Sequence, residues 1–183
     1  MKKISLTLLA FLMINISFGQ KRYYTKTGNL SFRAGTAVED IDGLNKSVTS
    51  IFDTNTGQIE FALLVKGFEF KSALMEEHFN ENYMESDKYP KSVFKGKIIN
   101  LEKINFLIGG TYPVTVRGTL EIHGVKEEVE ATGTFKVDNG IITSTASFNV
   151  ALADYNIAIP SLVKDKISKT AEIKVNCTYA LLN

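Results

Sequence analysis

The sequence predicts an all-β domain with one inserted helix, and three observations support this fold class. Apolar and polar residues alternate with a period of two over much of the chain, as they do in half-buried strands. Turn-forming residues interrupt the alternation, for example at Asp138-Asn139-Gly140. One segment, 72–84, instead repeats large apolar residues every four positions, which is the period of an amphipathic helix.

The alternation defines the expected strands. Residues 57–66 set Ile59, Phe61 and Leu63 against polar neighbours, and later segments repeat this pattern. Eight or nine antiparallel strands favour a closed barrel or a sandwich, and one inserted helix suits a barrel with a covered mouth. Periodicity alone does not choose between these two. The clear strand candidates are 57–66, 112–123, 127–137 and 171–181; the weaker ones are 22–27, 30–34, 47–53, 92–100 and 141–152, with an acidic loop at 37–43.

Three glycines fall on the expected inward faces of these strands. Gly96, Gly118 and Gly133 are in register with apolar residues rather than in turns. Glycine weakens a strand interior, so each position needs a physical reason. The sharp coiling of a small barrel is one reason, and space for a ligand is another. We favour coiling, and the two reasons are compatible at one position.

The expected helix has one apolar side, on which Met75, Phe79 and Tyr83 recur every four residues. Ser72 fits its N-cap and Pro90 stops it, so we expect the helix to end between residues 84 and 87. Acidic residues occupy the other side, and we interpret them as a solvated helix face rather than a metal site. Leu74 and Met84 widen the apolar side, and the acidic residues are Glu76, Glu77, Glu81, Glu85 and Asp87.

Residues 1–19 have the form of a cleavable signal peptide. Two lysines precede an apolar run, 4–14, that is too short for a transmembrane helix. Ser17 and Gly19 are small residues at the two positions that a signal peptidase reads, so we expect cleavage after Gly19. Residues 20–183 then form one exported domain, which we expect in the periplasm.

Composition narrows the function classes. Without the two lysines of the leader the chain has 19 basic and 20 acidic residues and no basic patch, so nucleic acid is not an expected partner. Cys177 is the only cysteine, and we interpret it as a small buried hydrophobe on a strand. His78 and His123 do not have metal-ligand spacing, and we interpret His123 as a hydrogen-bonding turn residue rather than a catalytic base. The sequence therefore predicts no metal, no cofactor and no catalytic residue.

Three blocks of sequence together match a known family. They are SALMEEHFNENYMESDKYPKSVFKGKII (72–99), GTLEIHGVKEEV (118–129) and SFNVALADYNIAIPSLVKDKI (147–167). In this order, behind an export signal, they resemble the YceI-like family of bacterial envelope proteins. The resemblance implies a closed antiparallel lipocalin-like β-barrel of about eight strands with one inserted amphipathic helix. It also implies that an apolar pore in the barrel binds a long isoprenoid lipid.

We therefore expect an exported, non-catalytic protein that sequesters or carries an isoprenoid-type lipid, polyisoprenoid or quinone-like. One alternative is a cell-envelope structural or interaction protein with a packed barrel and no ligand. A third hypothesis is an enzyme that uses His123 and nearby carboxylates on a lipid head group. Transient membrane contact and a homodimer stay open as further interactions. The expected pore residues are Phe61, Phe68, Phe70, Leu74, Met75, Phe79, Tyr83, Phe94, Val116, Phe135, Phe148, Tyr155 and Ile159.

Overall fold

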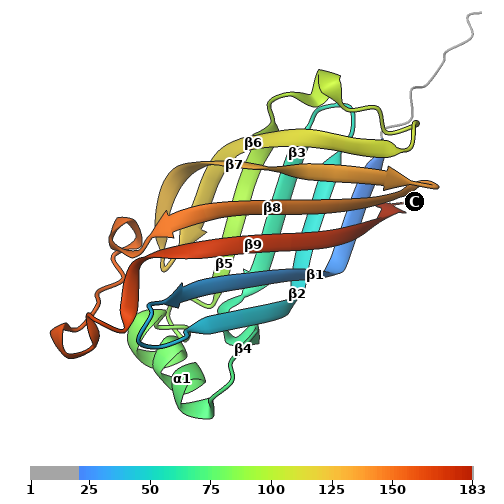
Figure 1. Ribbon diagram of the computed structural model, residues 1–183. Helices are drawn as coiled ribbons and strands as arrows, with labels where there is room; N and C mark the ends of the chain where they lie inside the picture. The colour runs from blue at the N-terminus through green and yellow to red at the C-terminus, as the bar shows by residue number, and fades with distance from the viewer. Residues whose placement is uncertain (1–20, 183) are drawn as a thin grey trace, which may run out of the picture.

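The computed structural model describes residues 21–182, so the predicted signal peptide, 1–19, lies outside the described residues. The described part consists mostly of antiparallel strands (Figure 1). The strands are β1 (Arg22–Gly35), β2 (Asp42–Asp53), β3 (Gln58–Leu64), β4 (Phe68–Glu69), β5 (Lys91–Ile98), β6 (Gly110–Ile122), β7 (Val125–Asp138), β8 (Ile141–Ala151) and β9 (Ile167–Leu182).

Eight of these strands form a closed barrel, which confirms the predicted barrel and excludes a sandwich. The order around the ring is β1-β9-β8-β7-β6-β5-β3-β2, and pairing of β1 with β2 closes it. The ninth strand, β4, pairs only with the start of β2. Closure gives every strand of the ring a partner on both sides over at least part of its length, which pairs backbone groups that an open sheet would expose.

The first two strands differ from the predicted ones. The segments 22–27 and 30–34 form a single strand, β1, whose register against β2 shifts on both sides of Gly28. Such irregularities bend a strand without ending it. They also interrupt the alternation of apolar and polar residues from which strands are predicted. Strand β2 begins at Asp42 rather than at residue 47, because Asp42 pairs with Arg33 across the hairpin. Strand β4 was not predicted, since two residues are too few to show a period.

The predicted helix is present, and its second half is a π-helical turn. Helix α1 (Ala73–His78) continues directly into η2 (Phe79–Tyr83), where the Met84 amide donates to the Phe79 carbonyl at 2.9 Å. This wider turn inserts one residue and brings Met84 into the interior. Ser72 occupies the N-cap, although its side chain makes no capping hydrogen bond. The remaining short helices are η1 (Val65–Gly67), η3 (Leu101–Lys103), η4 (Leu152–Tyr155) and η5 (Ser161–Val163).

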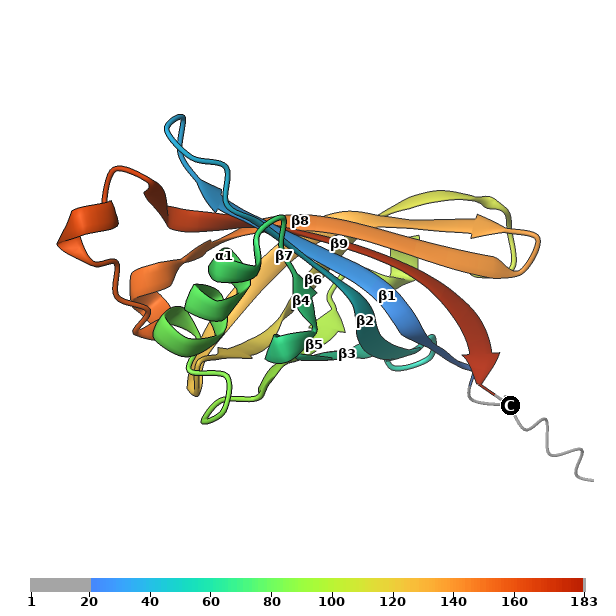
Figure 2. The ribbon, with the colours of Figure 1, turned by 90° about the horizontal axis from the view of Figure 1, so that it is seen from below.

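The two ends of the barrel differ. Helix α1, the β1–β2 loop and the β8–β9 loop lie at one end, and the last residues of β9 lie at the other (Figures 1 and 2). We call the first the mouth end, and we call residues 68–84, which contain β4, α1 and η2, the lid. The opposite end is the closed end, and it contains the turn between β7 and β8.

Aromatic rings fill the closed end. The Phe52 ring lies 5.2 Å from that of Tyr23, 5.0 Å from Phe135 and 4.9 Å from Tyr179, measured between centroids. Phe106, from the segment between β5 and β6, adds a contact at 5.8 Å. We call these five side chains the aromatic plug. Phe52, Phe135 and Tyr179 are at most 3% exposed, so the plug excludes water from this end.

The Tyr179 hydroxyl in the plug is hydrogen-bonded. The Tyr179 hydroxyl and the Ser50 hydroxyl form a hydrogen bond of 2.9 Å, and Ser144 donates to the same Tyr179 oxygen at 3.5 Å. Cys177 is fully buried on β9, which confirms its interpretation as a core residue. Burial raises the pKa of its thiol to about 11, so the thiol is protonated and unreactive at neutral pH.

The inward glycines allow neighbouring strands to approach closely. Gly118 on β6 faces Gly96 on β5, and a Cβ at Gly118 would collide with the Lys95 carbonyl and the Gly96 Cα. A Cβ at Gly133 would likewise collide with the carbonyl of Thr145. Backbone, not a ligand, would therefore meet these side chains, which supports the coiling explanation.

His123 ties the lid to the barrel. It lies in the β6–β7 turn with a φ of 51°, and its side chain is 10% exposed. Its Nδ1 donates to the Tyr155 carbonyl at 3.1 Å, and its Nε2 lies 2.8 Å from a carboxylate oxygen of Glu85, just beyond the lid. The ring also makes an edge contact with Tyr89 at 4.6 Å. The prediction of a hydrogen-bonding turn residue is confirmed.

Gly118→Ala should destabilise the protein by about 1–3 kcal/mol or more, because the added methyl group has no space between two backbones. Urea unfolding followed by circular dichroism measures this change. Gly109→Ala is the matched control, since its Cβ would meet nothing closer than the Val137 carbonyl at 3.6 Å. Equal midpoints for the two variants would contradict the close-approach explanation.

His123→Ala should lower the free energy of unfolding by about 1–3 kcal/mol, because two hydrogen bonds are lost and the Tyr155 carbonyl and the Glu85 carboxylate lose this donor. Hydrogen exchange should rise in the segment 85–89. His78 is exposed at the mouth of the cavity, so His78→Ala should change stability by less than about 0.5 kcal/mol. If both variants behave alike, His123 does not anchor the lid.

Candidate functional site

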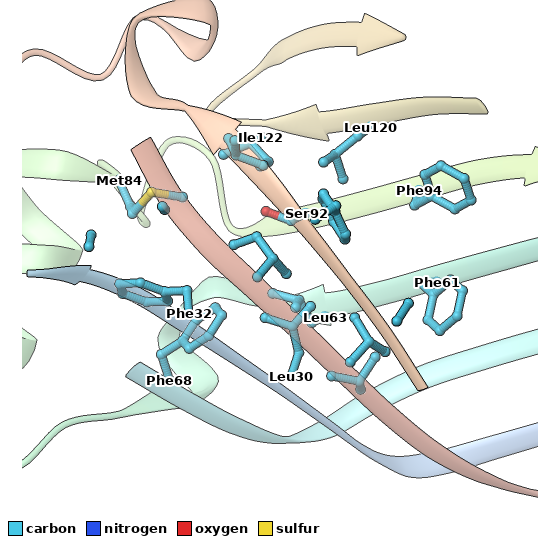
Figure 3. A pocket seen from close by; sticks show the side chains of 18 of the residues that line it. Leu30, Phe32, Phe61, Leu63, Phe68, Met84, Ser92, Phe94, Leu120 and Ile122 are labelled. Atoms are coloured by element: carbon cyan, nitrogen blue, oxygen red, sulfur yellow. The ribbon is translucent and has the colours of Figure 1, made fainter. Parts of the chain in front are cut away.

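An apolar cavity of about 520 Å³ occupies the barrel between the aromatic plug and the lid. Its walls come from inward-facing positions of the strands, among them Leu63, Leu120 and Ile122 (Figure 3). Phe135 of the plug also lines the cavity and contributes to its floor. Phe79, Tyr83 and Met84 of the lid region cover it from the mouth end. This volume lies in the range of pockets that hold small organic ligands, roughly 300–1,000 Å³.

Most of the predicted pore residues surround this cavity. They reach it from the strands and from the lid, and they alternate along each strand as expected for one inward face. The predicted residues that line the cavity are Phe61, Phe68, Phe70, Leu74, Met75, Phe79, Tyr83, Phe94, Val116, Phe135 and Phe148. Whether they contact a ligand stays a prediction.

Tyr155 and Ile159 do not line the cavity. Pairing between β7 and β8 begins only at Thr132, so the first half of β7 has no partner in β8. Short helix η4 packs there, and Tyr155 is buried in a cluster with Met84, Leu120 and Val150. Its ring therefore packs beside the barrel wall rather than in the cavity. Ile159 lies in the loop that follows η4.

The surroundings of Tyr155 are apolar. Its hydroxyl is buried and has no hydrogen-bond partner among the described residues. Burial, followed by the nearby carboxylates of Glu127 and Asp154, raises the pKa of Tyr155 to about 12. Tyr155 is therefore neutral over the physiological pH range, and it contributes to the structure through the apolar packing of its ring.

Sequence reasoning missed one aromatic anchor of the cavity. Phe32 on β1 lines it and stacks on Phe79 of the lid at 5.3 Å. Its ring also meets Phe68 edge-on at 5.3 Å, so β1 and the lid, which are far apart in sequence, join here. The alternation of Leu30 and Phe32 was the available signal, but the shifts in β1 obscured it. Other missed lining residues are Leu30, Val48, Ile59, Leu63, Met84, Ser92, Leu120, Ile122, Val129, Ala131, Ala146, Val150, Ile173 and Val175.

Charged side chains line the cavity only at its mouth end. Glu39 comes from the β1–β2 loop, Lys166 from the β8–β9 loop and His78 from α1. The charges of Glu39 and Lys166 neutralise one another, because their side chains pair at 3.0 Å. Tyr83 also lines the cavity from the lid, and its burial raises its pKa. No strand of the described chain contributes a charged side chain, so the deeper cavity suits an uncharged, apolar chain.

The described residues offer no metal centre in this cavity. Within residues 21–182, no group of His, Cys, Asp and Glu side chains has the arrangement to hold a metal ion. The same residues contain no helix that is long and apolar enough to cross a membrane. His123 is not among the lining residues, because it is turned toward Glu85 and the Tyr155 carbonyl.

Comparison with known proteins agrees with this geometry. No curated protein matches the chain. A solved polyisoprenoid binding domain from Saccharophagus degradans, implicated in plant cell wall breakdown, aligns with a TM-score of 0.76 at 14% identity, covering 88% of this chain and 98% of that domain. BcnA of Burkholderia cenocepacia aligns with a TM-score of 0.68 at 16% identity, covering 84% of this chain and 96% of BcnA. At these low sequence identities, the two alignments show that this chain shares its fold with both proteins. The YceI-like domain matches residues 22–179, and the chain therefore belongs to the YceI-like family.

Proposed function

We propose that this protein is an exported carrier or buffer that holds the tail of one isoprenoid-type lipid in its barrel, without catalysing a reaction. The observation that carries the proposal is the apolar cavity of about 520 Å³, closed by the plug and covered by the lid. Export rests on the signal-peptide pattern of residues 1–19, and a periplasmic location follows from it. The structural similarity to a polyisoprenoid binding domain supports this choice of ligand class.

The energetics favour an apolar tail. Each buried methylene contributes about 0.8 kcal/mol, so a tail of several carbons offsets a substantial part of the association cost of roughly 4–15 kcal/mol. The strand walls of the cavity carry no charged side chain, which supports a position of any polar head group at the mouth, near Glu39, Lys166 and His78. The tail would therefore enter first, toward Phe135.

The cavity also favours this proposal over the packed-barrel alternative. A structural or interaction protein of this fold would fill its interior, as the plug does around Phe52. The mouth half of the barrel has small inward side chains instead, including Ala131, Ala146 and Ala171. Small inward-facing side chains leave the interior space that a hollow barrel requires.

Organic extraction of the protein, purified from an exporting host, tests the proposal directly. Mass spectrometry of the extract should detect a polyisoprenoid or quinone-like species at close to one molecule per protein. A protein that emerges empty and also fails to take up added prenols would contradict the carrier function and favour the interaction alternative.

Ala131→Trp should block lipid binding while leaving the protein folded. Ala131 is half-buried on β7, lines the cavity and faces Val116 across the β6–β7 pair, so an indole there would occupy the space of the tail. Titration with farnesol should show at least about tenfold weaker binding, equivalent to about 1.4 kcal/mol.

Ala180→Trp is the matched control. Ala180 is exposed on β9 near the closed end, where an indole should leave farnesol affinity unchanged. Thermal unfolding of both variants checks that the Ala131 substitution does not act through misfolding. Unchanged affinity in folded Ala131→Trp would mean that the tail lies elsewhere.

A further inference from the structure

The mouth of the cavity is surrounded by apolar side chains that face solvent. Leu162, in η5, is 95% exposed, and Val38, in the β1–β2 loop, is 69% exposed. Leu74 of the lid is 58% exposed and also lines the cavity. Apolar residues that are exposed singly are common on protein surfaces, whereas an exposed apolar patch at the opening of an apolar cavity indicates an interaction surface.

The two loops that carry Val38 and Leu162 are held together. Thr36 Oγ1 donates to the Asp165 carbonyl at 2.7 Å, and Lys166 pairs with Glu39 at 3.0 Å. We call these loops, 36–41 and 161–166, the rim. Because Val163 and Ile41 of the rim line the cavity, the apolar surface is continuous from the interior to the exposed tips.

We propose that the rim docks on a lipid bilayer, with Leu162 and Val38 inserted in its apolar layer. This inference rests on the proposed function, since it describes how the ligand reaches the cavity. A tail that leaves a bilayer through water exposes its whole apolar surface, whereas a tail that moves along a docked rim does not. Two inserted side chains provide weak, reversible binding, which allows release after exchange.

The charge of the rim indicates whether it should prefer a neutral or an anionic bilayer. Glu39, Asp40 and Asp165 are balanced by Lys164, Lys166 and the adjacent Arg33, which pairs with Asp40 at 2.6 Å. A balanced rim gains little from anionic lipids. Docking should therefore occur on neutral phosphatidylcholine and should change little with salt.

The chain contains no tryptophan, so one substitution gives a specific reporter of insertion. Leu162→Trp should shift its fluorescence to shorter wavelength when phosphatidylcholine vesicles are added. Leu107→Trp is the matched control, because Leu107 is 83% exposed in the segment just before β6 at the closed end. Its emission should not shift. No shift for Leu162→Trp, or equal shifts for both variants, would overturn the proposal.

Removal of the apolar tips tests the same surface by loss of function. The double variant Val38→Asp with Leu162→Asp should bind phosphatidylcholine vesicles at least tenfold more weakly in flotation, whereas Leu107→Asp should bind normally. A requirement for phosphatidylserine, or loss of binding at physiological salt in the unmodified protein, would overturn the apolar mode of docking.

Farnesol titration without vesicles separates this proposal from the proposed function. The double variant should bind farnesol normally and take up prenol from vesicles more slowly. Failure of the unmodified protein to bind farnesol would contradict the carrier function, while normal binding with no vesicle contact would contradict only the docking. If sedimentation shows a dimer that the double variant dissociates, without vesicle binding, a second copy covers the rim and the bilayer proposal fails.

Discussion

The packing of aromatic rings around Phe52 determines how the interior of this barrel is divided. Four rings surround it at centroid distances of 4.9–5.8 Å, and together they seal one end. An eight-stranded barrel is just wide enough to be filled by large side chains or to hold one ligand. Rings fill the closed end around Phe52, whereas small residues such as Ala131 and Ala146 face inward further along. The closed half is therefore packed and the mouth half is hollow.

The hollow half needs a cover, since an open apolar cavity would expose its walls to water. The lid supplies it, and its attachment differs at its two sides. Phe79 packs on Phe32 of the barrel through apolar stacking, whereas Glu85, just beyond the lid, is held by a hydrogen bond to His123. Apolar packing tolerates small displacements better than a directional hydrogen bond does. The Phe32 side of the lid is therefore held by the less directional of the two contacts.

The residues also explain which features sequence reasoning predicts. Period-two alternation identified the inward face of β3 through Ile59, Phe61 and Leu63, and the four-residue period identified the helix. Neither pattern shows how far a residue lies between the closed end and the mouth end. Phe135 in the plug and Phe148 in the hollow half therefore look alike in sequence. Tyr155 was misplaced because β7 and β8 separate before Thr132, and strand register between distant segments leaves no local signal. The wider turn that buries Met84 is equally invisible to a regular period.

The position of charge connects the cavity to the rim. Every charged side chain that lines the cavity belongs to the mouth end, and the ion pair of Lys166 with Glu39 joins the two rim loops. A lipid whose head group stays at this ion pair would keep that polar group in water. Its tail would lie in apolar surroundings both in the cavity and in a bilayer. The same head group sits at the polar layer of a bilayer when the tail is in the membrane. In the proposed docking, exchange between barrel and bilayer would therefore change the surroundings of the tail alone, and the polar head group would keep its contact with water.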